Sequence, residues 1–279
     1  MDIKNETIRE MNKRSISEDN ECRCEIQEMR KIEDFTSKLG ALLFGRDYVV
    51  LKNSYFSLQR VSTSFELTAG SIINCCESGC IADAYSLLRK YRDDMFFYLY
   101  IMIYEAEKKL ENDLEHVTRI ESCVKKWMTN DLKNLNITTV LKDISQSTKV
   151  QEAVNKYGMK DYFQKIGKTL NDYVHSNGIS FYNMNINEYK NGEFLNALQS
   201  LTEDMRLITV TFLFLLTLCS PLSIMANDLL DYLECGLTPP EGAQYWVAPF
   251  IVEFFKNNLD LIDESCRKYL RDNTYMEFE

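Results

Sequence analysis

Proline and glycine are scarce in this sequence. Of 279 residues only 4 are proline and 10 are glycine, and every proline lies in the last quarter, at Pro221, Pro239, Pro240 and Pro249. Because proline breaks helix interiors, a chain with none before residue 221 favours long uninterrupted helices over a turn-rich β-sandwich. With 45% hydrophobic and 27% charged residues, the chain can build a sizeable core in one or two domains, which excludes a wholly disordered or collagen-like polypeptide.

Positive charge is also in deficit. The 32 lysines and arginines are outnumbered by 42 aspartates and glutamates, which gives a net charge of −10 and an isoelectric point of about 4.9. This balance argues against a protein that coats nucleic acid through its overall charge, although a local basic groove is compatible with it. The common catalytic signatures G-x-x-x-x-G-K-[ST], G-x-G-x-x-G, G-x-S-x-G and H-E-x-x-H are absent, so P-loop, dinucleotide-fold, hydrolase and zincin chemistry lack their residues. We expect no cofactor.

Nine cysteines are scattered along the chain, and their odd number indicates free thiols in a reducing compartment. Neither Cys22-Arg23-Cys24 nor Cys75-Cys76-x3-Cys80 is matched by a second pair at zinc-site spacing, and neither His116 nor His175 lies near them in sequence. We therefore expect no metal site. The first residues contain no apolar signal-peptide core, so the sequence predicts a cytoplasmic protein.

Apolar residues recur at three- and four-residue steps along most of the chain, as in amphipathic helices. This pattern predicts an all-α, mainly antiparallel helical bundle without a β-hairpin. The first 34 residues carry 17 charged side chains, 10 acidic and 7 basic, which predicts a charged tail or solvated helix over 1–34, followed by a single helical domain over 35–279. Helices are expected at about 48–78, 81–110, 111–130, 159–177, 193–234 with a break near Ser220-Pro221, and 246–271, with short helices within 131–158.

Residues 207–226 form an uncharged run of twenty residues, long enough to cross a bilayer. Six of them are Thr, Ser or Pro, the flanks are mainly acidic, and Arg206 is the only nearby cation, so the positive charge that normally flanks a membrane span is absent. We expect a buried core helix here and no contact with a membrane. A protein anchored in a membrane through 207–226 is the alternative.

The clearest candidate for chemistry is His175, near the end of a predicted helix. Lys168, Asn171 and Asp172 precede it by seven, four and three positions, so all four side chains fall largely on one helix face. That face combines an imidazole that titrates near neutral pH with a carboxylate and an amide that could orient it and a cation for a phosphate. The alternative is that His175 only caps its helix.

A second polar cluster lies on the most apolar helix, within Arg89-Lys90-Tyr91-Arg92-Asp93-Asp94. Arg89 and Arg92 project to the same side, where their planar guanidinium groups could bind a phosphate. The alternative is structural, because an arginine at the edge of a buried face needs a partner and Asp93 lies at i,i+4 from Arg89.

The segments LLRKYRD (87–93) and LNDYVHSNG (170–178) resemble the HEPN superfamily, the higher eukaryotes and prokaryotes nucleotide-binding domains. Over roughly residues 45–272 the chain looks like bacterial members with an arginine-containing second helix and a Tyr-Val-His helix end. Many HEPN proteins are ribonucleases of toxin–antitoxin and antiviral defence systems, usually dimers that bring two R-x4-6-H motifs together. The resemblance therefore implies a HEPN-like fold, RNA and an antitoxin or other protein as partners, and a homodimer.

Carried over by residue, the resemblance implies that His175 is the motif histidine and Asn171 the polar residue beside the motif arginine. The arginine itself is missing, because the spacing leads to Leu170, Thr169 or Lys168. A metal-independent endoribonuclease would use His175 as general acid or base, Lys168, Arg89 and Arg92 to stabilise phosphate charge, and Asn171 and Asp172 for orientation. The alternative function is a non-catalytic helical interaction or regulatory protein.

Overall fold

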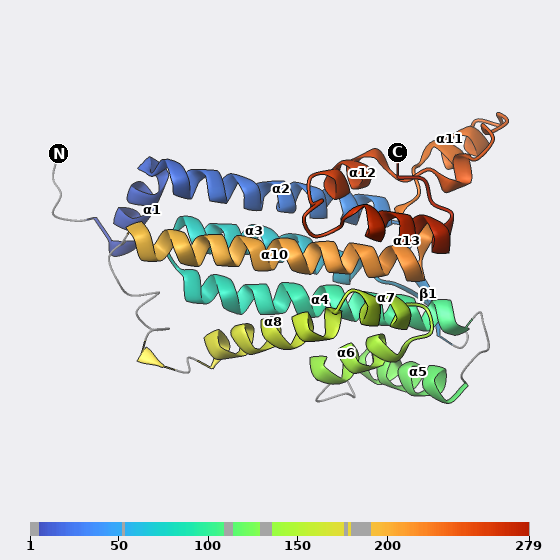
Figure 1. The fold of residues 1–279 in the computed structure, drawn as a ribbon, viewed down its shortest axis with the longest axis horizontal. Coiled ribbons are helices and arrows are strands. Elements are labelled where there is room, and N and C mark those ends of the chain that lie inside the picture. The colour runs from blue at the N-terminus through green and yellow to red at the C-terminus, as the bar shows by residue number, and fades with distance from the viewer. Residues whose placement is uncertain are drawn as a thin grey trace. The chain divides into compact units, whose positions relative to one another are not determined.

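The computed structural model describes residues 6–51, 54–108, 114–128, 136–175, 178–179 and 191–278. These residues are overwhelmingly helical (Figure 1), which confirms the all-α prediction. The elements are α1 (Ile8–Glu18), α2 (Asn20–Leu43), β1 (Tyr48–Leu51), β2 (Ser54–Ser57), α3 (Gln59–Glu77), α4 (Ile81–Lys108), α5 (Leu114–Met128), α6 (Ile137–Gln146), α7 (Gln151–Lys156), α8 (Met159–Val174), α10 (Asn191–Cys219), η2 (Pro221–Ile224), α11 (Asp228–Glu234), η3 (Ala243–Tyr245), α12 (Pro249–Lys256) and α13 (Glu264–Thr274).

The chain divides into two compact units, each assembled from separate stretches of sequence. Unit 1 contains Met1–Ser37, Thr63–Asp94 and Met159–Thr209, and unit 2 contains Lys38–Ser62, Met95–Gly158 and Val210–Glu279. In this division the N-terminal residues belong to the same unit as the first half of α4, α8 and most of α10. Sequence position alone does not show which distant segments share a core.

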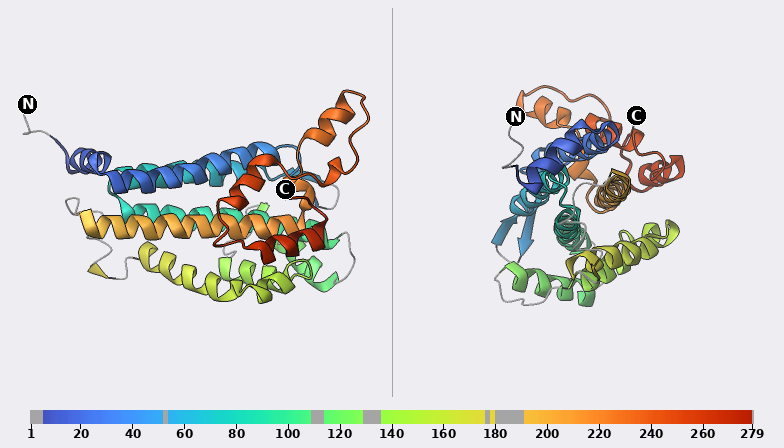
Figure 2. Two further views of the ribbon diagram at one scale, coloured as in Figure 1. Left: turned by 45° about the horizontal axis from the view of Figure 1, so that its top comes forward. Right: turned by 90° about the vertical axis from the view of Figure 1, so that its left-hand side faces the viewer.

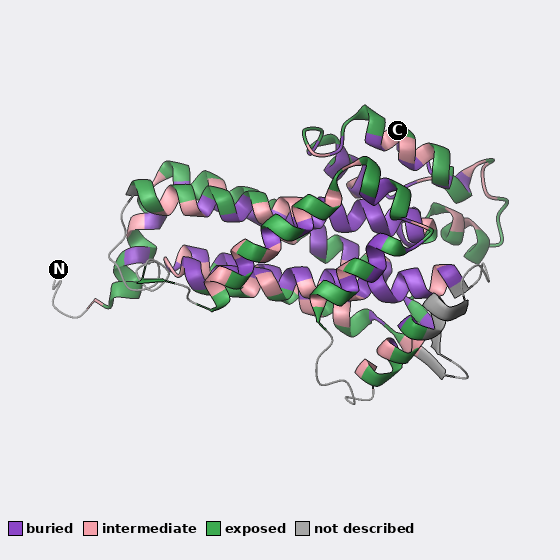
Figure 3. Ribbon diagram, turned by 60° about the horizontal axis from the view of Figure 1, so that its bottom comes forward, coloured by how far each residue is buried: buried purple, intermediate pink, exposed green. Residues whose placement is uncertain are grey.

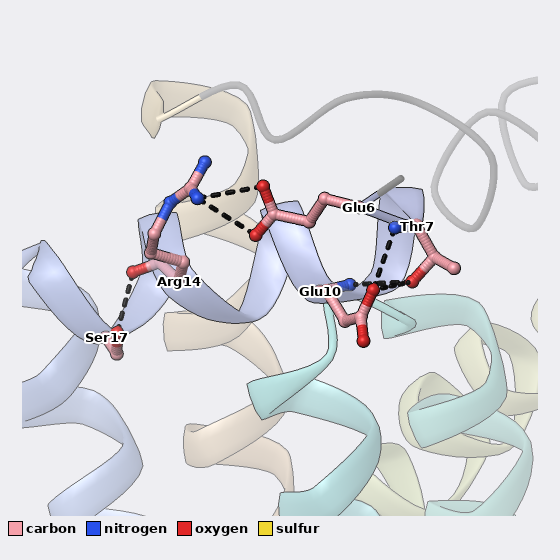
Figure 4. Close-up of polar contacts among 5 residues, drawn as sticks. All are labelled: Glu6, Thr7, Glu10, Arg14 and Ser17. Atoms are coloured by element: carbon pink, nitrogen blue, oxygen red, sulfur yellow. Dashed lines mark hydrogen bonds and ion pairs between the residues drawn. The ribbon is translucent and has the colours of Figure 1, made fainter. Parts of the chain in front are cut away.

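The charged N-terminal segment forms α1 and most of α2, and it buries one face. Its buried apolar side chains recur at helical spacing, at Ile16, Cys22, Ile26, Met29 and Ile32. Thr7 begins α1 with a capping box, in which its hydroxyl accepts from Glu10 N and the Glu10 carboxylate accepts from Thr7 N (Figure 4). The many charges of this segment therefore lie on the solvent-facing sides of α1 and α2.

The expected helix start at residue 48 is wrong, because residues 48–51 and 54–57 form two paired strands. β1 and β2 pair antiparallel with Tyr48 opposite Ser57 and Val49 opposite Phe56. Aromatic and β-branched residues dominate both strands and favour extended backbone, although their spacing also fits a helix. The side chain of Val49 is fully buried. Helix α3 then begins at Gln59, eleven residues later than predicted.

Within unit 1, neighbouring helices are not all antiparallel. α2 and α3 run antiparallel, since Arg30 pairs with Glu77 and Ser37 donates to Glu66. α4 and α10 run in the same direction: the Tyr91 and Thr209 hydroxyls lie 2.7 Å apart, and earlier on both helices Asp204 lies close enough to Tyr85 to raise its pKa. Buried and exposed residues alternate along the helices (Figure 3), as the sequence period predicts.

The uncharged run 207–226 packs as the end of α10 and as η2. Its buried threonine hydroxyls bond to backbone carbonyls of the same helix: Thr209 donates to the Met205 carbonyl and Thr217 to the Leu213 carbonyl, each at 2.8 Å. α10 ends at Cys219, just before Pro221, as the proline predicts. Among the described residues, no helix has the length and apolar character that a membrane crossing requires.

The predicted helix over 246–271 is also wrong, because the structure has two shorter helices there. α12 ends at Lys256 and α13 begins at Glu264. The Asn258 amide donates to the Phe254 carbonyl at 2.7 Å, and the Asp263 carboxylate accepts from Cys266 N at 2.8 Å as the N-cap of α13. These two side chains satisfy backbone groups that a continuous helix would have paired, so they terminate one helix and start the next.

Candidate functional site

Helix α8 presents the predicted polar face to solvent. Its inner side buries Phe163, Ile166 and Leu170, whereas Lys168, Asn171 and His175 are exposed and Asp172 is half-buried. The backbone N–H of His175 donates to the Asn171 carbonyl at 3.0 Å, so the helical hydrogen-bond pattern extends one residue past Val174. The four residues therefore lie on one side of α8, as their spacing predicts. The predicted helix stop at Asn177 lies outside the described residues.

The His175 side chain itself is open. Within the described part of the chain, no hydrogen bond or ion pair joins its imidazole to Lys168, Arg89 or Arg92. Lys168 and His175 stand two helical turns apart, about 10 Å along the axis. One copy of the chain thus offers a histidine and a lysine on an accessible face without enclosing them.

Arg92, in contrast, is enclosed and paired. Its side chain is 2% exposed, and its Nε and Nη2 donate to Asp93 Oδ1 at 2.8 and 2.6 Å. Burial raises the pKa of Asp93, and the neighbouring Arg92 and Arg89 partly oppose that rise. Two of the three guanidinium nitrogens of Arg92 therefore serve Asp93, as the structural alternative predicts.

Arg89 is more accessible than Arg92. Its side chain is 30% exposed, and its Nε lies 3.9 Å from Asp93 Oδ2, at the limit of an ion pair. Both arginines thus converge on one carboxylate, with Arg92 on one oxygen and Arg89 on the other. Of the two predicted phosphate ligands, only Arg89 has a guanidinium within reach of solvent.

α4 and α8 are joined by two contacts that fix their register. The rings of Tyr85 and Tyr173 stack with centroids 3.8 Å apart. A Cβ on Gly167 would lie 3.7 Å from Arg92 Nη1, so the guanidinium lies against α8 one residue before Lys168. Because residue 85 faces residue 173 and residue 92 faces residue 167, the two helices run antiparallel. The structure thus places Arg92 against the middle of α8, whereas His175 follows the last residue of that helix, Val174.

Two polar groups missed by the sequence analysis lie between α4, α8 and α10. The hydroxyl of Tyr162 is buried and has no hydrogen-bond partner, and the charges of Asp204, Arg92 and Glu203 act on it. Burial raises the pKa of Asp204 to about 6. The charge of Lys165 partly opposes this rise, and the charge of Glu203 adds to it. Asp204 also raises the pKa of Tyr173. The sequence contained one sign that Asp204 faces inward: its neighbours at helical spacing, Leu201, Met205 and Ile208, are apolar and buried.

A metal centre has no donor set in the part of the chain that the structure describes. No group of three or more histidine, cysteine, aspartate or glutamate side chains there could hold a metal ion. All nine cysteines are free thiols.

No family model, curated protein or solved structure matches this chain.

Proposed function

We propose that this chain is a HEPN-like, RNA-targeting protein of the defence or toxin type, and that it cleaves RNA without a metal ion. The observation that carries the proposal is the exposed side of α8, on which Lys168, Asn171 and His175 stand together with open side chains. An exposed imidazole can contact a substrate and serve as general acid or base, and a lysine on the same face supplies positive charge to an otherwise acidic protein.

In this mechanism the RNA 2′-hydroxyl attacks the adjacent phosphate and displaces the 5′-oxygen of the next nucleotide. His175 transfers the proton as general base or general acid. Lys168 stabilises the charge that develops on the phosphate oxygens, and Asn171 and Asp172 orient the imidazole or the ribose. Arg89 is the guanidinium available to a neighbouring phosphate, whereas Arg92 is paired with Asp93.

A second copy of the chain completes the centre. The two-turn separation of Lys168 and His175 is too long for both to contact one phosphate from a single α8 without help. Two copies that face each other through α8 would supply two histidines and two lysines to one groove. The proposal therefore predicts that the active species is a homodimer.

Substitution of Lys168 tests the proposal directly. Lys168→Arg creates an R-x6-H sequence with His175, and the planar guanidinium can bind a phosphate through two hydrogen bonds. We expect Lys168→Arg to cleave total cellular RNA at least as fast as the unmodified protein in EDTA, and Lys168→Ala to be slower by about tenfold or more. Equal rates for all three proteins would show that α8 does not hold the substrate.

A second function, a non-catalytic interaction protein, is favoured by a different feature. Helix α11 has no buried residue. Together with the following loop it projects from the edge of unit 2 (Figure 2), where it contacts η3. Leu230, Leu233 and Leu237 are 40%, 56% and 59% exposed there. Leu230 and Leu233 lie one turn apart on α11, as apolar anchors do on a helix that binds in a partner's groove, and Leu237 follows the end of the helix.

A photo-crosslinking amino acid at position 233 tests this alternative. In cells that express the protein, the interaction function predicts one discrete crosslinked product. The control is the same amino acid at position 67, because Leu67 on α3 is 67% exposed. Identical crosslinking patterns from positions 233 and 67 would argue against a partner at α11.

A further inference from the structure

The turn between α3 and α4 closes in a way that brings two cysteines together. Cys80 N donates to the Cys75 carbonyl at 2.9 Å, and Gly79 N donates to the Cys76 carbonyl at 3.0 Å. Gly79 has a φ of 77°. This pair of hydrogen bonds around a left-handed glycine is the Schellman motif that ends many helices.

The motif places the side chains of Cys75 and Cys80 in the two positions that normally make a hydrophobic contact across such a turn. The 2.9 Å backbone hydrogen bond keeps their Cα atoms within about 7 Å of each other. Most disulfides join Cα atoms about 4.4–6.8 Å apart. Both side chains are half-buried, so a small oxidant can reach them.

The surroundings distinguish these two thiols from their neighbour Cys76. The Cys76 side chain is fully buried, and burial raises its pKa far above the ordinary thiol value, which makes it inert. Burial raises the pKa of Cys75 and Cys80 as well, Asp83 on α4 adds to the rise, and Arg9 on α1 opposes it. Cys80 also raises the pKa of Cys75, which is consistent with close approach of the two sulfurs.

We propose that Cys75 and Cys80 are a modification site, a dithiol that a peroxide converts to an intramolecular disulfide. One thiolate attacks a peroxide oxygen and forms a sulfenic acid as hydroxide leaves. The second thiol then displaces the sulfenic oxygen as water, and the S–S bond forms. With hydrogen peroxide, the two thiols lose two electrons and two protons, and the peroxide is reduced to two molecules of water.

The fold is prepared for this bond. Gly79 is held between the cysteines by the Asn12 side chain of α1, whose Nδ2 would lie 2.9 Å from a Cβ at that position. The backbone turn already exists in the dithiol form, so oxidation needs only rotation of the two side chains. Cys80 gives up a weak contact of its Sγ with the Ser78 carbonyl at 3.7 Å. We expect the helical content to stay unchanged on oxidation.

Mass spectrometry of the full chain tests the proposal. The exposed Cys24 and Cys235 are first replaced by serine to prevent intermolecular disulfides. The protein is then treated with hydrogen peroxide, alkylated with iodoacetamide and digested with trypsin. In a Cys76→Ser version, the peptide 61–89 should lose the mass of two hydrogen atoms, remain unalkylated, and recover two alkylation sites after dithiothreitol. The same loss should occur with Cys76 present, with one alkylated cysteine.

Cys75→Ser and Cys80→Ser should each abolish the loss. Asp83→Asn should accelerate it severalfold at neutral pH, because it removes a charge that raises both thiol pKa values. Complete alkylation of Cys75 and Cys80 after peroxide, in folded protein, would overturn the proposal. A disulfide that persists in Cys80→Ser would assign the bond to Cys75 and Cys76 and would overturn it equally.

Discussion

The rings of Tyr85 on α4 and Tyr173 on α8 stack face to face, with centroids 3.8 Å apart and planes 8° from parallel. Tyr85 is almost fully buried, and Tyr173 stands two residues before His175. The stack therefore fixes the last turn of α8 against the first turns of α4. In the proposed ribonuclease this contact decides where the histidine points.

Removal of the Tyr85 or the Tyr173 ring should destabilise the protein, because the stacking contact between the two rings is lost. We expect Tyr85→Ala to lower the free energy of unfolding by about 3 kcal/mol, as for other large-to-small changes in a core. A double-mutant cycle with Tyr173→Ala should give a coupling energy of about 1 kcal/mol, the range of aromatic pairs. Urea denaturation of the two single variants and the double variant measures it. Strictly additive losses would contradict a direct interaction between the rings.

Asp204 should make the protein less stable as the pH rises through the weakly acidic range. Its folded-state pKa is about 6, raised by burial from the ordinary value of 3.8. The folded state therefore holds the proton more tightly than the unfolded state, and stability falls between about pH 4 and pH 6. Because the carboxyl group is partly solvated, we expect a loss of about 1–2 kcal/mol.

Asp204→Asn should remove this pH dependence and stabilise the protein at pH 7 by a similar amount. Glu193→Gln is the matched control, because Glu193 is an exposed acid on the same helix, α10. Denaturation curves recorded from pH 4 to pH 8 compare the three proteins. A parallel pH profile for Asp204→Asn and the unmodified protein would show that another group titrates in this range.

The two adjacent aspartates of α4 should differ sharply in their contribution to stability. Asp93→Ala leaves the enclosed Arg92 without its partner, and unpaired buried charges cost about 3–5 kcal/mol. Asp94 pairs with Lys90, whose side chain is 49% exposed, and accepts from Ser64 at 2.7 Å. Asp94→Ala should cost about 1 kcal/mol, because solvent replaces the lost contacts. Similar losses for both variants would mean that Arg92 finds water when Asp93 is removed.

The long helices were predictable because their cause is local. The apolar period, the proline at 221 and the glycine at 158 locate α4, α8 and the end of α10 within a few residues. The strand pair 48–51 and 54–57 was missed because four-residue strands are too short to separate from helical spacing by periodicity alone. The split between α12 and α13 depends on side-chain caps at Asn258 and Asp263, whose hydrogen bonds a sequence pattern does not reveal.

The candidate site was likewise predictable only where its residues lie on one helix. Lys168, Asn171, Asp172 and His175 share a face because they lie on one helix. The pairing of Arg92 with Asp93 and the buried position of Asp204 depend on how α4, α8 and α10 pack, and residues distant in sequence determine that packing. The sequence therefore predicts which side chains share a face of one helix. It does not predict which carboxylate pairs with a given arginine.

The most direct test of the RNA-targeting function is cleavage of total RNA and tRNA by the purified protein in EDTA. His175→Ala is compared with His116→Ala, because these are the two histidines of the chain. We expect cleavage by the unmodified protein and by His116→Ala, products that end in a 2′,3′-cyclic phosphate, and loss of cleavage in His175→Ala. Cleavage that survives in His175→Ala, or no cleavage by a folded, dimeric unmodified protein, would contradict this expectation.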